Sequence, residues 1–193
     1  EILPRLLDKG IRVVLPAPFY KLEYYEASFA KLAGVCIEGA VYNKPSGTFA
    51  GRLFKRMFNA LLNVKNIEVY YRRRVMPKKS LPYRLVYRLI HVAGRYKLVQ
   101  HSARFIFLRL SPSGFFGELL DKYNPDLVVV TDLHNENDVA LMQDARRRGI
   151  PIAGIVRSWD HLTSKGLLKI VPDVIFAPNQ VVKSDAIKFH GVP

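Results

Sequence analysis

The chain has 193 residues, of which 49% are hydrophobic and 24% charged, and its formal net charge is +14. This composition is that of a globular domain with one core, and it excludes a chain that is disordered throughout. No apolar run approaches the ~20 residues that a membrane-spanning helix needs. Cys36 is the single cysteine, which excludes an internal disulfide. We therefore expect a protein of a reducing compartment, the cytoplasm.

Helical and strand-like patterns alternate along most of the chain. The predicted strands are 11–18, 35–42, 124–132, 151–159 and 172–178, with a turn at 43–47 and a loop at 160–166. The predicted helices are 2–10, 22–34, 48–64, 83–100, 115–123, 134–149 and 179–191, with a helical turn at 167–171. Residues 66–74 fit either type, and 101–110 fit a continuation of the preceding helix.

This alternation is typical of a Rossmann-like α/β domain, in which helices flank a parallel sheet. We expect one such domain over residues 1–193, with a basic helical segment at 44–110 within it. The helix at 2–10 leads directly into a strand, which is the second half of a β-α-β unit. We therefore expect the domain to be truncated at both ends and to belong to a longer protein.

The positive charge is concentrated in residues 44–109, which hold sixteen Lys or Arg residues and one acid, Glu68. Residues 119–193 hold nine residues of each sign and are neutral. One acid against sixteen bases is hard to obtain from a mixed solvated surface. We therefore predict that this segment meets a polyanion or an anionic membrane surface, the alternative being a solubilising face without a ligand.

Two helices of the basic segment are predicted to be amphipathic, with an apolar stripe beside a basic one. The apolar stripes are Leu53, Met57, Leu61 and Val64 in the first helix, and Leu85, Leu89, Val92, Tyr96 and Val99 in the second. The cations predicted to bind the anionic partner are Arg52, Lys55 and Arg56 in the first helix, and Arg84, Arg88 and Arg95 in the second.

Ligands of an open parallel sheet bind where strands end at their carboxyl edge, and the segment after the strand at 124–132 is rich in functional groups. There His134 lies near Asp132, and either is a candidate general base for an acceptor hydroxyl. The alternative for His134 is an exposed residue without a role. Glu136 either lines the cleft or stabilises the first turn of the following helix. No second His stands at ligand spacing, so we predict no metal site.

The segment RSWDHLTSKG follows the next strand. We predict that its polar and aromatic side chains bind substrate: Ser158, Trp159, Asp160, His161, Thr163 and Lys165. The alternative is a structural corner in which Trp159 fills the core and Asp160 binds loop amides. The chain has no Walker loop, no GxGxxG and no nucleophile-elbow glycines around Ser158. A P-loop enzyme, a classical dinucleotide enzyme and a serine hydrolase are therefore disfavoured.

Four stretches are similar to a known family: YNPDLVVVTD, a helix ending RRRGIP, SWDHLTSKG and PDVIFAPNQVVKSDAIKFHGVP. Residues 119–193 resemble the N-terminal domain of GT-B-type glycosyltransferase-like proteins of bacterial surface-polysaccharide biosynthesis. Their relatives are the CDP-glycerol glycerophosphotransferases and the UDP-N-acetylglucosamine 2-epimerase superfamily. The resemblance implies an acceptor-binding half without a cofactor of its own, inactive alone. The nucleotide-activated donor would bind a C-terminal domain after Pro193.

Three functions follow from these observations. The first is the acceptor-binding half of a transferase that moves a sugar or glycerol phosphate to a cell-surface glycan or lipid-linked acceptor, peripherally at the inner face of the membrane. The second is a nucleic-acid-binding α/β module, because tyrosines interleave with arginines between 70 and 96. No helix-turn-helix, RRM or KH signature supports the second. The third is half of a nucleotide-sugar epimerase.

Overall fold

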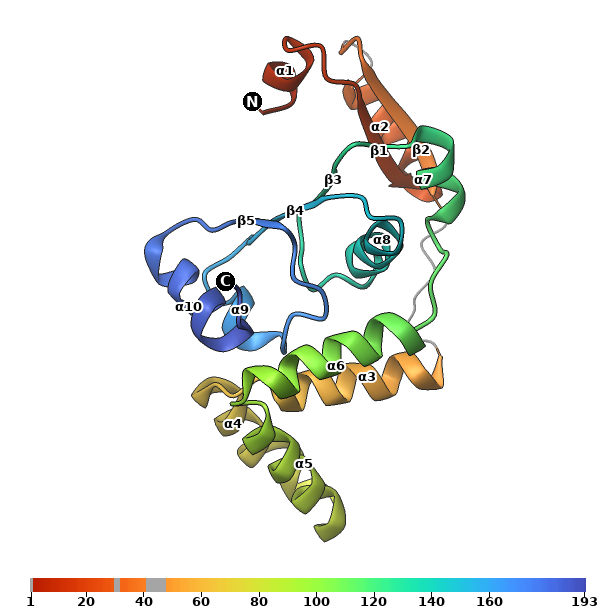
Figure 1. Cartoon of the computed structure of the whole chain (residues 1–193). Coiled ribbons are helices and arrows are strands. Elements are labelled where there is room, and N and C mark those ends of the chain that lie inside the picture. The colour runs from red at the N-terminus through yellow and green to blue at the C-terminus, as the bar shows by residue number, and fades with distance from the viewer. Residues whose placement is uncertain (1, 30–31, 41–47) are drawn as a thin grey trace. The chain divides into compact units, whose positions relative to one another are not determined.

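The computed structural model describes residues 2–29, 32–40 and 48–193 (Figure 1). Short parallel sheets are flanked by helices, which confirms the predicted α/β class and is compatible with a Rossmann-like fold. Where the sequence predicts one domain, contacts divide the chain into two compact units: Glu1–Asn43 with Phe115–Asn124, and Lys44–Gly114 with Pro125–Pro193. We call them unit 1 and unit 2. The predicted turn at 43–47 lies outside the described residues.

Unit 1 is built on a parallel pair of strands. It comprises α1 (Ile2–Leu7), β1 (Val13–Pro18), α2 (Leu22–Phe29), β2 (Val35–Ala40) and α7 (Gly117–Tyr123). Val13 is aligned with Val35 and Pro18 with Ala40. Glu38 joins β2 to α7, because its carboxylate accepts hydrogen bonds from Lys122 Nζ at 3.0 Å and from the Tyr123 hydroxyl at 2.5 Å.

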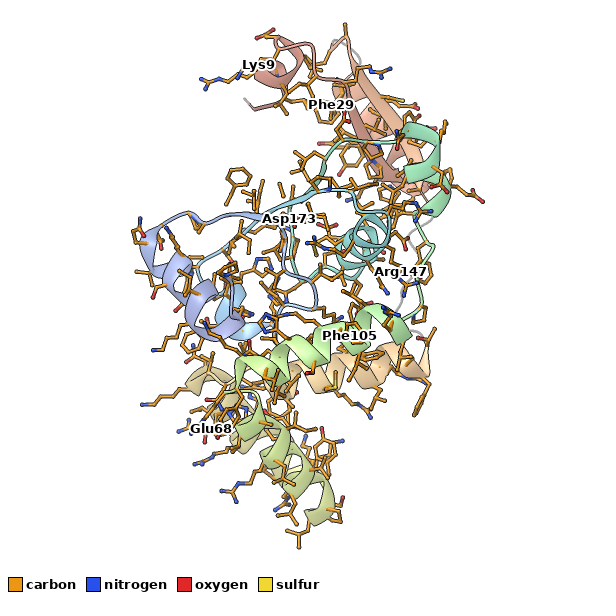
Figure 2. All side chains as sticks on the ribbon, in the orientation of Figure 1. Lys9, Phe29, Glu68, Phe105, Arg147 and Asp173 are labelled. Carbon is orange, nitrogen blue, oxygen red and sulfur yellow. The ribbon has the colours of Figure 1, made fainter. Side chains whose placement is uncertain are left out.

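Unit 2 contains a three-stranded parallel sheet in the order β3-β4-β5. Its strands are β3 (Val128–Val130), β4 (Ile152–Ile155) and β5 (Val174–Phe176), and its later helices are α8 (Glu136–Arg147), α9 (His161–Ser164) and α10 (Gln180–His190). Asp173, labelled in Figure 2, fixes the start of β4 by accepting the Ile152 N–H at 2.8 Å. Its other oxygen lies 2.7 Å from Arg146 of α8.

The basic segment is helical in the described residues from 48 onward. It forms α3 (Phe49–Leu61), α4 (Lys65–Tyr70), α5 (Leu81–Ala93) and α6 (Lys97–Leu110), with a π-helical turn at Tyr71–Val75. Helices α3 and α6 lie side by side, and α5 projects away from the sheet (Figure 1). The Phe107 ring packs edge-on against Phe54 at 5.3 Å and against Phe58 at 5.6 Å. The buried face of α3 therefore carries these aromatic residues, while Leu53 of the predicted stripe is exposed.

The prediction of one helix over 83–100 is wrong, because α5 ends at Ala93 and α6 begins at Lys97. Gly94 lies at the break, where a Cβ atom would be 1.9 Å from the Leu61 carbonyl oxygen of α3. Only glycine lets the two backbones approach this closely. The predicted helical turn at 167–171 is also wrong. That stretch is irregular, and the Leu167 N–H donates to the Phe58 carbonyl at 2.9 Å.

Among the described residues, no helix combines the length and the apolarity that crossing a bilayer requires.

Candidate functional site

The carboxyl ends of β3 and β4 meet at one edge of the unit 2 sheet because the two strands are parallel neighbours. The segments that follow them bring Asp132, His134, His161 and Lys165 together. His161 Nε2 lies 2.8 Å from Asp132 Oδ1, and the His134 and His161 rings are 5.1 Å apart. Two segments nearly thirty residues apart in sequence thus share one cluster of titratable side chains.

Asp132 is buried at the centre of this cluster, where backbone N–H groups and neighbouring cations hold its carboxylate. Its Oδ1 accepts the N–H groups of His134 at 3.0 Å and Asn135 at 3.1 Å. Its Oδ2 lies 3.6 Å from Lys165 Nζ and 3.7 Å from Arg157 Nη1. Burial acts to raise the pKa of Asp132, but these hydrogen bonds and cations outweigh it and leave the pKa below its ordinary value. Asp132 is therefore an ionised carboxylate with weak basicity.

His161 is fully buried, and each of its ring nitrogens lies against a protein group. Its Nδ1 accepts the Arg157 N–H at 3.3 Å, so the neutral ring carries its proton on Nε2. The Nε2 contact with Asp132 is close but is not aligned as a hydrogen bond. Burial lowers the pKa of His161 despite the neighbouring carboxylate. His161 thus orients the segment after β4 and the Asp132 carboxylate. A ligand would therefore be contacted by the other side chains of the cluster.

The Nε2 of His134, like that of His161, is buried and has no hydrogen-bond partner among the described residues, but the Nε2 of His161 lies 2.8 Å from the Asp132 carboxylate. Burial, with His190 and His161 nearby, lowers the pKa of His134 to about 3. The imidazole is therefore neutral at physiological pH. It is in the form that accepts a proton, but it is a weak base in the free chain.

His190 is a third histidine of the cluster that the sequence reasoning missed, and its ring lies 6.4 Å from that of His134. It is fully buried at the end of α10, where its Nδ1 accepts the Leu168 N–H at 3.1 Å and its Nε2 faces the Leu162 carbonyl at 2.7 Å. Arg104 of α6 donates to the His190 carbonyl at 2.6 Å. In the sequence, His190 beside Gly191 indicates only a helix end.

The remaining predicted residues of RSWDHLTSKG are arranged around Asp160. The Ser158 hydroxyl donates to Asp160 Oδ1 at 2.6 Å, and the Thr163 hydroxyl donates to the Asp160 carbonyl at 3.3 Å. The Ser158 hydrogen bond lowers the pKa of Asp160. Trp159 is 76% exposed, so it does not fill the core. Loop hydroxyls thus bind the Asp160 carboxylate, whereas the corner interpretation expected loop amides at Asp160 and a core position for Trp159.

A pocket of about 70 Å³ lies beside the cluster, between α3 and the carboxyl edge of the sheet. Its polar lining is Lys55, Asn59, His134, Glu136, Lys165 and Lys169. Lys55 Nζ lies 2.9 Å from Glu136 Oε1, which ties α3 to the start of α8. Burial lowers the pKa of Lys169, with a smaller contribution from Lys55, while Glu136 opposes the shift. The signal for Lys169, which the sequence reasoning missed, is a lone cation inside the apolar run LLKIV.

The six cations predicted to bind an anionic partner are exposed. Lys55 belongs to the pocket, whereas Arg84 on α5 donates to the Lys79 carbonyl at 2.9 Å. Arg88 lies one turn further along α5, and Arg95 lies in the turn after it. Within the described ranges, no group of three or more His, Cys, Asp or Glu side chains is arranged to hold a metal ion.

Comparisons with protein-family models, with curated proteins and with solved structures find no significant match. The likeness of SWDHLTSKG and its flanking stretches to GT-B-type proteins stays a prediction from the sequence.

Proposed function

We propose that the chain is the acceptor-binding half of a GT-B-like transferase that works peripherally at the anionic, cytoplasmic face of a membrane. The complete transferase moves a sugar or glycerol phosphate to a glycan or lipid-linked acceptor, and its second domain binds the nucleotide-activated donor. The observation that carries the proposal is found in unit 2. There a cleft-edge cluster of Asp132 and His134 occurs together with a helix, α5, whose exposed face is aliphatic and bordered by arginines.

The exposed face of α5 has the composition of an interfacial helix. Leu81, Leu85, Leu89 and Val92 recur every three or four residues and are 66%, 53%, 71% and 51% exposed. Residues at this spacing share one side of a helix. Arg84 and Arg88 flank the stripe, and the buried Tyr87 anchors the opposite side. Aliphatic side chains that enter the acyl boundary, beside arginines that meet lipid phosphates, are what binds an anionic bilayer surface.

The alternative of a nucleic-acid surface has less support in the same region. Tyr71 and Tyr87 stack on one another at 4.5 Å, and Tyr87 stacks on His91 at 5.7 Å. Rings that are used for packing in this way do not offer a face to an incoming base. The side chains that α5 does expose are mainly aliphatic, which favours acyl chains over bases.

In the proposed reaction, His134 or Asp132 accepts the proton of an acceptor hydroxyl. The acceptor oxygen then forms a bond to the donor carbon or phosphorus, and the nucleotide leaves with the bonding electrons. An anionic acceptor next to His134 would raise its pKa and make it a stronger base. In the full-length protein, His134→Ala is expected to abolish transfer from a panel of nucleotide-activated donors. Unchanged transfer by this variant would remove His134 from the mechanism.

Vesicle flotation tests the membrane part of the proposal. The chain should float with phosphatidylglycerol-containing vesicles but not with pure phosphatidylcholine, and salt should weaken binding. Leu85→Ser with Leu89→Ser should abolish flotation. The matched control is Val181→Ser with Ile187→Ser, on exposed positions of α10, which should float like the unmodified chain. Absence of flotation together with steeply salt-dependent binding to single-stranded RNA would contradict the proposal and favour the nucleic-acid alternative.

A further inference from the structure

We infer that the pocket between α3 and the carboxyl edge of the unit 2 sheet is a binding site for a phosphate group carried by the acceptor. The site itself is argued from its own geometry, and only its assignment to an acceptor rests on the proposed function. The ligand class is a phosphomonoester or phosphodiester whose oxygens accept hydrogen bonds from lysine side chains.

The first argument is the convergence of cations from three places in the chain. Lys55 comes from α3, Lys165 from the residue after α9, and Lys169 from the stretch that leads to β5. Glu136 is the one carboxylate among the pocket-lining residues, and it is in contact with Lys55. The lining therefore carries a surplus of positive charge. Just outside it, the Asp132 carboxylate lies near Arg157 as well as near Lys165, so the surplus persists.

The second argument is His134, a residue that lines the same pocket and whose buried Nε2 atom has no hydrogen-bond partner in the described part of the chain. An unpartnered buried polar atom is unfavourable, and most such atoms in proteins find a partner. A neutral ring with its proton on Nε2 donates to an oxyanion. A phosphate oxygen in the pocket would supply the acceptor that this nitrogen lacks.

The third argument is the size and lining of the pocket. Its volume of about 70 Å³ is several times the ~10–15 Å³ that one water needs, so it admits a group as large as phosphate. Its apolar lining includes Phe58, Leu133 and Leu167, which are buried and exclude water. Charge interactions are stronger in such surroundings. A tetrahedral group with several oxygens can contact three ammonium groups at once.

Isothermal titration calorimetry of the whole chain, without vesicles, tests the inference. The probes are inorganic phosphate, glycerol 3-phosphate and dihexanoyl phosphatidic acid below its micelle concentration, with sodium chloride as the ionic-strength control. We expect saturable binding of both phosphoesters, at least as tight as that of inorganic phosphate. Lys169→Met and Lys165→Met should each weaken binding and raise the Kd by about tenfold or more. Lys183→Met, at an exposed position of α10, is the matched control and should leave Kd unchanged.

A second readout covers the case in which a pocket variant fails to fold. In the unmodified chain, glycerol 3-phosphate should shift the His134 side-chain ¹⁵N resonances and leave those of the exposed His101 unchanged. Equal Kd values in the Lys169 and Lys183 variants, or no saturable binding of any probe, would overturn the site. Binding of inorganic phosphate alone would overturn its assignment to an acceptor. The α5 variant with Leu85→Ser and Leu89→Ser should keep phosphate binding, so failure of the membrane proposal and failure of this site are distinguishable.

Discussion

Acidification should weaken the folding of unit 2 through His190, which is fully buried. Its Nδ1 accepts the Leu168 N–H, so protonation at that nitrogen removes a hydrogen bond as well as placing a charge in the core. Burial, with Arg104 nearby, lowers the pKa of His190 from 6.5 to about 4. Between these two values the unfolded chain binds a proton that the folded chain rejects. Stability is therefore fully present above the unfolded pKa and is lost as the pH falls toward the folded pKa.

The lowered pKa of His190 sets the size of the effect. A shift from 6.5 to about 4 corresponds to roughly 3 kcal/mol of unfolding free energy, of which about 2 kcal/mol is lost between pH 7 and pH 5. Urea unfolding followed by circular dichroism at these two pH values measures the loss. His190→Gln, which does not titrate, should lose about 2 kcal/mol less than the unmodified chain over this interval. Its absolute stability does not matter, because only the difference between the two pH values is compared.

The control variant is His101→Gln, because His101 is exposed on α6 and, among the described residues, its side chain bonds only within its own helix, to the Lys97 carbonyl at 2.8 Å. It should lose as much stability as the unmodified chain. His134, with its pKa lowered to about 3, should contribute a similar amount to that of His190, so His134→Gln together with His190→Gln should flatten the profile further. Equal losses in the unmodified chain, His190→Gln and His101→Gln would refute the reasoning.

Three further predictions concern stability and are measured by urea unfolding at pH 7.5. Gly94→Ala should destabilise the chain by about 2 kcal/mol or more, because its Cβ would lie 1.9 Å from the Leu61 carbonyl oxygen. Arg104→Met should cost about 2–3 kcal/mol, because the buried His190 carbonyl loses its charged donor at 2.6 Å. Asn179→Ala should cost about 1 kcal/mol, since its side chain caps α10 by accepting the Val182 N–H.

Each of these variants has its own comparison. Ser102→Ala, at an exposed position of α6, should change the unfolding free energy by less than about 0.5 kcal/mol and serves as the baseline. A Gly94→Ala protein as stable as this baseline would contradict the reasoning. It would show that the α5–α6 turn moves away from the Leu61 carbonyl without a cost in stability. Arg104→Lys keeps a positive charge without the guanidinium geometry. If it were as stable as the unmodified chain, charge alone, and not the directed hydrogen bond, would account for the role of Arg104.

Local sequence patterns predicted most elements of the structure. The five strands of the described residues lie inside their predicted ranges, because runs of β-branched and apolar residues between turn residues are a local signal. The break at Gly94 was not predicted, because the signal for it is not local. A single glycine is tolerated within a helical pattern, and what excludes any other residue there is the Leu61 carbonyl of another helix. Periodicity within one helix carries no information about that contact.

The candidate site was likewise predicted from the sequence only in part. The sequence could place Asp132, His134 and His161 after neighbouring strands, because the carboxyl edge of a parallel sheet follows from chain order. It could not show that His161 would be buried with both ring nitrogens against protein. It also could not show that His190, from the last helix, would reach the same cluster. Burial depends on which segments pack together over long sequence distances.

By itself the sequence determined the α/β class, the strand positions, the basic helical segment and the two segments at the sheet edge. Only the tertiary structure decided which faces are buried. It buried Phe54 and Phe58 of α3 and left Leu85 and Leu89 of α5 exposed. It also brought Lys169 to the pocket that Lys55 lines. The physical reason is that helical spacing in the sequence predicts which residues share one face of a helix. Packing across the whole unit decides which other element, or solvent, that face contacts.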